Sequence, residues 1–217
     1  MTDLKGLTNK RSGIAAYPLT ESDIAAANLC MQEAFPPGEQ FPIEQLLRFA
    51  AADPARSWLD LWFLDQQFAG FTYTTKVPGD ADRTYLAYLA ISGALRGQGL
   101  GTEILRRVTA ENTETLWCLG VERPIAATPE YAARTRRLRF YARNGWIPVF
   151  TRSTAVSILS SSHAAVPFLL EHRWTSSKGS GNHSQRPKHI QKYLNSVMLS
   201  TLFSRTQVLW LQKKRSR

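Results

Sequence analysis

A glycine-rich stretch near the middle of the chain most narrows the folds that this sequence can adopt. Residues 96–101 read Arg-Gly-Gln-Gly-Leu-Gly, shortly after an apolar and aromatic run at 84–91 and before a helix-like segment at 101–111. A strand that turns through glycines into a helix leaves free backbone amides at the helix N-terminus, where the helix dipole also attracts an anion. The stretch therefore predicts a strand–turn–helix unit that binds a phosphate group.

The spacing of the glycines excludes the two most familiar nucleotide-binding loops. A P-loop needs a lysine after its last glycine, whereas Thr102 follows Gly101. A dinucleotide-binding loop needs a further glycine three residues after Gly99, and that position is again Thr102. Arg96 can add a charge-assisted contact, and glycines let the backbone approach a ligand closely. The sequence therefore predicts a phosphate site outside those two classes.

Hydrophobic periodicity and turn residues predict the remaining elements of the fold. Strands are expected at 13–19, 58–64, 68–75, 84–91, 115–121, 146–150 and 164–170, and helices at 24–35, 43–51, 101–111 and 130–144. This order lacks the regular strand–helix alternation of a parallel sheet. It favours an α/β or α+β fold around a largely antiparallel sheet.

The charge of the chain is concentrated at its C-terminal end. The net charge is +10, but residues 1–150 contain 16 basic and 16 acidic residues, whereas 151–217 contain 11 basic residues and a single acid, Glu171. We therefore expect a polar segment at 1–12, a folded domain at 13–176 and a basic appendage at 177–217. The appendage could contact an anionic surface or nucleic acid, or it could be incidental sequence, the interpretation that we favour.

The cysteine content and the N-terminus bear on the compartment of the protein. Cys30 and Cys118 are too few for a disulfide framework, and no Cys/His cluster has the spacing of zinc ligands. The N-terminal residues lack an apolar leader, and no stretch reaches the roughly 20 apolar residues of a membrane span. We therefore expect a cytoplasmic protein with no metal.

Two motifs resemble those of the GNAT superfamily of N-acetyltransferases, in particular its small bacterial members. Residues 96–101 match the pyrophosphate-binding pattern Gln/Arg-x-x-Gly-x-Gly/Ala of that family. Residues 140–146 resemble its later Phe-Tyr-x-x-x-Gly-Phe motif, with Trp146 in place of the final Phe. The two motifs have the expected order and separation, and the resemblance extends over roughly 13–172.

Two further segments show a weaker resemblance. Residues 119–124 are similar to the Leu-Glu-Val-Glu-x-Pro end of a strand, and 35–40 are similar to a substrate loop that bears glutamate. Gly120 and Gly38 stand at positions where the family often has glutamate. The resemblance therefore supports the roles of substrate-binding residues less directly than it supports the cofactor site.

The resemblance implies a mixed, mostly antiparallel sheet that splays between its fourth and fifth strands, with helices on both faces. Acetyl-CoA would enter the splay as co-substrate, with its pantetheine paired to a strand backbone and its pyrophosphate on the glycine turn. The residues implied for acetyl-CoA are Leu89, Ala90, Ile91, Arg96, Gly97, Gln98, Gly99, Leu100, Gly101 and Thr102.

The reaction implied is direct attack of a primary amine on the thioester, which needs positioning, a proton acceptor and a proton donor. Tyr141 falls at the family's general-acid tyrosine, although it could also be a core aromatic. Glu122 is a candidate general base, or alternatively a surface carboxylate paired with Arg123. Glu39 is a candidate for binding the cationic substrate, or alternatively an exposed loop residue.

Other functions remain compatible with the sequence. The chain could be a basic protein associated with nucleic acid or the ribosome, or a GNAT fold that binds acyl-CoA without transfer. A covalent route through Cys118 is disfavoured, because no histidine occurs in the first 150 residues to activate the thiol. The acceptor could be a small polyamine, an aminoglycoside, an amino acid or a protein amine.

Overall fold

One mixed sheet forms the centre of the molecule. The computed structural model describes residues 4–12, 18–77, 80, 82–111, 115–149 and 207–212. Within these residues the sheet has seven strands in the order β1-β2-β3-β4-β5-β7-β6, and every neighbouring pair is antiparallel except β4 and β5.

The strands are β1 (Leu7–Arg11), β2 (Ser57–Leu64), β3 (Gln67–Lys76), β4 (Arg83–Ile91), β5 (Leu116–Glu122), β6 (Trp146–Val149) and β7 (Gln207–Gln212). The helices are α1 (Glu21–Ala34), α2 (Ile43–Ala52), α3 (Leu100–Ala110) and α4 (Tyr131–Arg143), with short 3-10 turns η1 (Pro37–Glu39) and η2 (Gly93–Leu95). None of the helices in the described part of the chain has the length and apolarity that a membrane crossing requires.

Local sequence explains the β2–β3 hairpin. Asp65 and Gln66 connect Leu64 to its cross-strand partner Gln67, and both have a positive φ, 48° and 67°. Two positive φ values in succession form the two-residue turn whose twist suits a hairpin. The flanking runs are aromatic and β-branched, as buried strands require.

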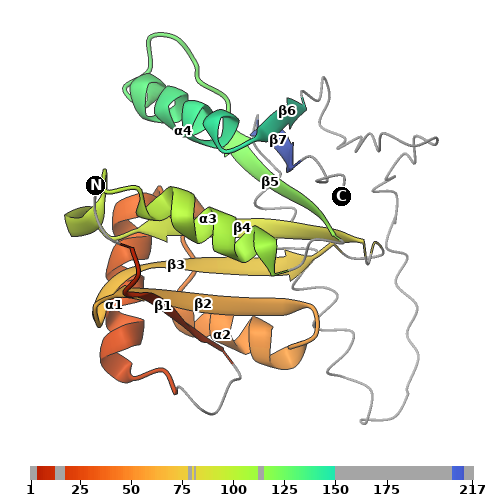
Figure 1. Cartoon of the computed structure of the whole chain (residues 1–217). Helices are drawn as coiled ribbons and strands as arrows, with labels where there is room; N and C mark the ends of the chain where they lie inside the picture. The colour runs from red at the N-terminus through yellow and green to blue at the C-terminus, as the bar shows by residue number, and fades with distance from the viewer. Residues whose placement is uncertain are drawn as a thin grey trace, which may run out of the picture.

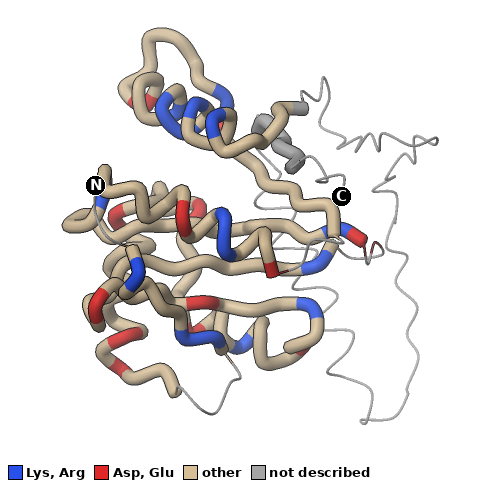
Figure 2. The backbone as a smooth tube through the Cα atoms, viewed as in Figure 1, with Lys and Arg blue, Asp and Glu red and all other residues tan. Residues whose placement is uncertain are grey.

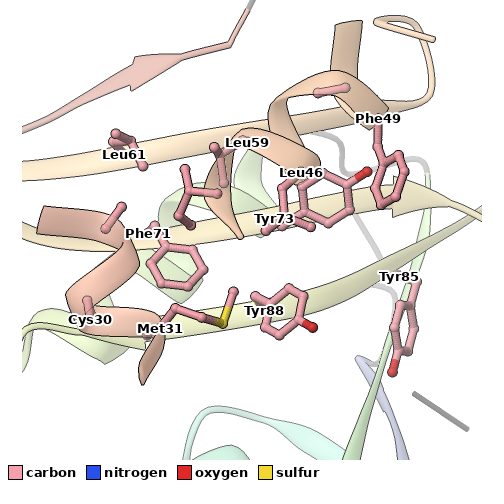
Figure 3. Packing of buried hydrophobic residues seen from close by; sticks show 14 of the residues in the cluster. Cys30, Met31, Leu46, Phe49, Leu59, Leu61, Phe71, Tyr73, Tyr85 and Tyr88 are labelled. Atoms are coloured by element: carbon pink, nitrogen blue, oxygen red, sulfur yellow. The ribbon is translucent and has the colours of Figure 1, made fainter. Parts of the chain in front are cut away.

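Two apolar clusters lie on opposite faces of the sheet and determine which helices cover each face. The first includes Met31 of α1 and Leu46 of α2, packed on Phe71 of β3 (Figure 3). The second includes Ile104 of α3 and Tyr141 of α4. Figure 1 shows α3 and α4 separated by the gap between β4 and β5. The expectation of helices on both faces is confirmed.

The sheet splays between β4 and β5, as expected. Their parallel pairing is confined to Arg83, Thr84 and Tyr85 in the described structure, and Figure 1 shows β5 running away from β4 beyond this point. On the other side of β4, Tyr73 pairs with Tyr88 but Thr74 pairs with Leu86, so Ala87 is an extra residue. Such a bulge bends and twists its strand. In the described part of the chain, residues 86–91 of β4 have no neighbouring strand on the β5 side.

The start of the sheet differs from the expectation. The first strand is β1 at Leu7–Arg11, within the segment expected to be a polar extension, whereas 13–17 lie outside the described residues. The two basic residues of β1 form ion pairs with other elements: Lys10 lies 2.7 Å from Asp23, and Arg11 lies 2.7 Å from the buried Asp60. The strand therefore looks polar in the sequence although it pairs along its length with β2.

The other edge of the sheet also differs from the expectation. Residues 207–212, within the expected appendage, form β7 between β5 and β6 and pair antiparallel with both. The strand expected at 164–170 lies outside the described residues. The sheet therefore includes a strand from the segment that was expected to be an appendage. Residue composition does not reveal this strand, because its pairing depends on contacts with segments far away in the sequence.

Candidate active site

A cleft of about 460 Å³ opens where β5 leaves β4. Its walls come from the end of α1, η1, β4, the end of β5 and α4, and it reaches the first turn of α3. Eight residues predicted for the site line it: Glu39, Leu89, Ala90, Ile91, Arg96, Gly101, Glu122 and Tyr141. Of the other five predicted residues, Gly97, Gln98 and Gly99 form the turn that leads from Arg96 into α3, and Leu100 and Thr102 lie in the first turn of that helix.

The glycine turn has the backbone that its sequence predicted. Gly97 and Gly99 have φ values of 82° and 86°, in the left-handed region that favours glycine, and no atom lies within 4 Å of where their Cβ would be. The amide of Thr102 donates to the carbonyl of Gly99 at 3.0 Å, so it belongs to the helix turn. The amides that precede it at a helix N-terminus have no intrahelical partner. They form the candidate anion site.

The third glycine of the motif has a different role. A Cβ at Gly101 would lie 3.3 Å from the ring of Phe140 and 3.7 Å from the side chain of Ile91. This position therefore allows α3 to approach both β4 and α4 at the end of the cleft. A side chain there would require the ring of Phe140 to shift by a few tenths of an ångström.

The charges around the turn suit an anion. Glu103 is the acidic residue in the first turn of α3, and hydrogen bonds from Arg106 and Arg107 hold its pKa at about 2 and neutralise its charge. α4 contains five arginines and no acidic residue, and Figure 2 shows these basic positions along the helix. The side chain of Arg96 donates to the carbonyl of Ile91 at 3.0 Å, which joins the turn to the end of β4.

Tyr141 is both a core aromatic and a cleft residue. Its side chain is buried and packs edge to face on Phe140 and Trp146, with ring centroids 5.0 and 6.0 Å away. Burial raises the pKa of its phenol to about 12, although the positive charge of Arg137 acts in the opposite direction. The phenol is therefore held in its protonated form at the side of the cleft.

The two predicted carboxylates lie on different walls. Glu122, at the end of β5, forms an ion pair with Arg134 of α4, with 3.0 Å between Oε2 and Nε. Arg134 and Glu122 belong to different elements, so this pairing depends on the tertiary structure. Glu39 is half-buried in η1 on the opposite side of the cleft, and its backbone carbonyl accepts a hydrogen bond from the Tyr88 hydroxyl at 2.6 Å.

Two tyrosines that sequence reasoning missed also line the cleft. Tyr85 and Tyr88 of β4 are both buried and belong to the same apolar cluster. Regular alternation would place residues three apart on opposite faces of a strand, but the bulge at Ala87 brings both onto one face. Tyr85 lies where β4–β5 pairing ends, opposite Cys118 of β5. No sequence signal reveals the bulge.

Cys118 does not take part in the candidate chemistry. The residue is 1% exposed, burial raises the pKa of its thiol to about 12, and the sulfur lies 3.5 Å from the carbonyl oxygen of Thr84. A thiol with so high a pKa contains little thiolate at neutral pH. Cys118 is therefore a small buried side chain rather than a candidate nucleophile.

The family profile of the acetyltransferase (GNAT) family matches residues 25–146, more than half of the chain. The matched region includes the glycine turn, the cleft and Tyr141. The chain belongs to the GNAT family. This membership supports acyl transfer as the general activity, with acetyl-CoA as the donor. No curated protein matches the chain.

Solved structures share the GNAT fold. A protein of Bacteroides thetaiotaomicron assigned to the GNAT family is 19% identical, with a TM-score of 0.53 over 92% of this chain and 87% of that one. An acetyltransferase of Thermus thermophilus is 19% identical, with a TM-score of 0.51 over 68% of this chain and 92% of its own. An acetyltransferase of Streptococcus agalactiae is 11% identical, with a TM-score of 0.51 over 96% and 98%. At these identities the likeness concerns the fold.

The residues of this GNAT chain fit acetyl-CoA. A pyrophosphate needs space and amides, and both Gly97 and Gly99 leave open space at the start of α3. A pantetheine arm needs an unpaired strand edge, which β4 has from residue 86 to 91. The described residues contain no group of three or more His, Cys, Asp or Glu side chains suited to a metal ion.

Proposed function

We propose that this chain transfers the acetyl group of acetyl-CoA to a primary amine by direct attack while both substrates are bound. The observation that carries this proposal is the convergence of Tyr141, Glu122 and Glu39 on one cleft, whose wall includes the open edge of β4. Acetyl-CoA, when bound, supplies a thioester that an amine can attack. The protein then has to position the amine and move two protons.

Backbone groups form the part of the cleft that is proposed to hold acetyl-CoA. Leu89, Ala90 and Ile91 lie on the open edge of β4, where their peptide groups would hold the pantetheine amides as a neighbouring strand does. The amides of the glycine turn would hold the pyrophosphate, helped by the positive end of the α3 dipole. A backbone N–H near Ile91 is the candidate for stabilising the oxygen that gains charge during attack.

Tyr141 is the proposed proton donor. Its raised pKa keeps the phenol protonated at neutral pH, and its ring is fixed by Phe140 and Trp146. A protonated hydroxyl held against the cleft can donate to the sulfur as the thiolate departs. Because Tyr141 is packed in the core, its ring moves little, and its hydroxyl donates a proton in one fixed direction.

Glu122 and Glu39 have separate proposed roles toward the acceptor amine. An alkylammonium has a pKa of about 10 and must lose a proton before it attacks. Glu122 lies at the end of β5 beside Gly120 and is the proposed acceptor of that proton, directly or through water. Glu39 lies on the α1 side and is proposed to bind the ammonium as it arrives. The acceptor is therefore a cationic amine, either a small molecule or a protein amine.

A mass-spectrometric screen of amines with acetyl-CoA tests the proposal. Polyamines, aminoglycosides, amino acids and short peptides are incubated with the protein, and a mass increase equal to one acetyl group marks an acetylated product. Tyr141→Phe is run in parallel to separate enzymatic from spontaneous acetylation. Acetyl-CoA binding without any product would favour a non-catalytic acyl-CoA-binding protein. Salt-sensitive binding to polynucleotide without acetyl-CoA binding would favour a nucleic-acid-associated protein.

A further inference from the structure

A short hydrogen bond joins the η1 turn to the middle of the sheet. The hydroxyl of Tyr88 on β4 donates to the backbone carbonyl of Glu39 at 2.6 Å, across 49 positions in the sequence. Both residues line the cleft. The bond ends on the same residue whose carboxylate is the candidate for binding the acceptor amine.

Tight packing fixes the direction of the Tyr88 hydroxyl. The residue is 1% exposed, its ring meets Phe35 edge to face at 4.9 Å, and Phe71 lies 6.3 Å from it in a tilted arrangement. Figure 3 shows the ring beside Met31, with its hydroxyl directed away from Met31 and Phe71. A ring confined in this way cannot follow a moving loop. The hydroxyl therefore acts as a fixed point on β4.

Three further hydrogen bonds of the η1 turn are local. The amide of Glu39 donates to the carbonyl of Pro36 at 2.9 Å, and that of Gln40 donates to Pro37 at 3.4 Å. The side chain of Gln40 donates to the carbonyl of Phe35 at 2.8 Å. These bonds shape the turn and join it to the end of α1. The bond from Tyr88 sets its position relative to β4.

We propose that Tyr88 is a positioning residue that holds η1 against β4 and thereby places the Glu39 carboxylate for the ammonium group of the acceptor. This inference rests on the proposed function, because it assigns Glu39 to the amine. Tyr88 lies directly before Leu89, the first of the three residues proposed for the cofactor. The strand that receives the acetyl donor therefore also sets the place of the acceptor.

Tyr88→Phe removes the hydroxyl and keeps the ring. Loss of one hydrogen bond that acts through Glu39 is expected to raise the KM for a cationic amine about three- to tenfold, with kcat within about twofold. Tyr73→Phe is the matched control, because Tyr73 is buried in the same cluster but does not line the cleft. The control is expected to leave the KM unchanged. Equal changes in both variants would overturn the proposal.

A double-variant cycle tests whether Tyr88 acts through Glu39. Glu39→Gln alone should raise the amine KM, and adding Tyr88→Phe should raise it no further, since there is no carboxylate left to position. If the two effects multiply, Tyr88 acts independently of Glu39 and the proposal is wrong. The KM for acetyl-CoA should be the same in all four proteins.

Hydrogen exchange provides a readout that needs no turnover. Amides of residues 38–41 should exchange faster in Tyr88→Phe than in the unsubstituted protein, because the turn is released from β4. Tyr73→Phe should leave their exchange unchanged. Unchanged exchange in Tyr88→Phe overturns the proposal whether or not the protein acetylates amines. A negative amine screen would instead reject the proposed function, so the two failures are distinguishable.

Discussion

The Oε2 atom of Glu122 lies 3.0 Å from the Nε atom of Arg134, and this ion pair joins the end of β5 to α4. Both side chains are largely buried, with 14% and 17% of their surface exposed. The candidate proton acceptor is therefore also a structural link between the two walls of the cleft. A substitution at either position breaks the link, but only one of them removes the carboxylate.

This pair allows the two roles of Glu122 to be separated. Glu122→Gln and Arg134→Gln should lower the thermal unfolding midpoint by similar amounts, because both break the pair. If Glu122 is the general base, turnover should fall about 100-fold or more in Glu122→Gln and less than about tenfold in Arg134→Gln. Steady-state kinetics and melting curves measure both effects. If Glu122→Gln and Arg134→Gln lose turnover equally, Glu122 has a structural role and is not the general base.

Gly99 provides the test of the pyrophosphate site. Gly99→Glu should weaken acetyl-CoA binding at least about 100-fold, because a negative charge would lie beside the phosphates. Gly99→Asn is the matched control, since asparagine tolerates the left-handed backbone and is neutral, and open space exists for either side chain. Isothermal calorimetry should show a much smaller loss for the control, while circular dichroism stays native in both. Similar affinities for the two variants would contradict an anion at this turn.

Tyr141→Phe tests the proton donor. Turnover should fall about 100- to 10,000-fold, or roughly 3 to 5 kcal/mol of barrier, with little change in the KM for acetyl-CoA. Because its raised pKa is about 12, the phenol stays protonated through pH 10. Turnover of the unsubstituted protein should therefore show no alkaline decline from this group below pH 10. A loss of less than about threefold in the variant would show that another group supplies the proton.

Deletion of residues 177–217 tests the edge of the domain. Composition alone predicts no effect on stability, but the deletion removes β7 and leaves β5 and β6 without their shared neighbour. We expect the unfolding midpoint to fall by about 5 °C or more. Acetyl-CoA affinity should change less, because the glycine turn and the open edge of β4 do not pair with β7. Deletion of 213–217, which keeps all of β7, is the control, and an unchanged midpoint in the longer deletion would place β7 outside the stable fold.

The sequence by itself determined the elements whose chemistry is local. The glycine turn, the helix after it and the Phe140–Tyr141 pair are contiguous patterns, because each depends on backbone dihedral angles or on neighbours within a few residues. The hairpin at Asp65 and Gln66 is local for the same reason. These features were sufficient to predict the family and the cofactor side of the cleft.

Only the tertiary structure decided several features of the sheet and of the cleft wall opposite the glycine turn. The bulge at Ala87 brings Tyr88 onto the face of Tyr85, Arg134 of α4 pairs with Glu122 of β5, and residues 207–212 form a strand inside the sheet. Each depends on segments that are far apart in the chain or on a one-residue shift of strand register, which reverses the direction of every following side chain. Residue order carries no local sign of such contacts, because the packing of the whole sheet selects them.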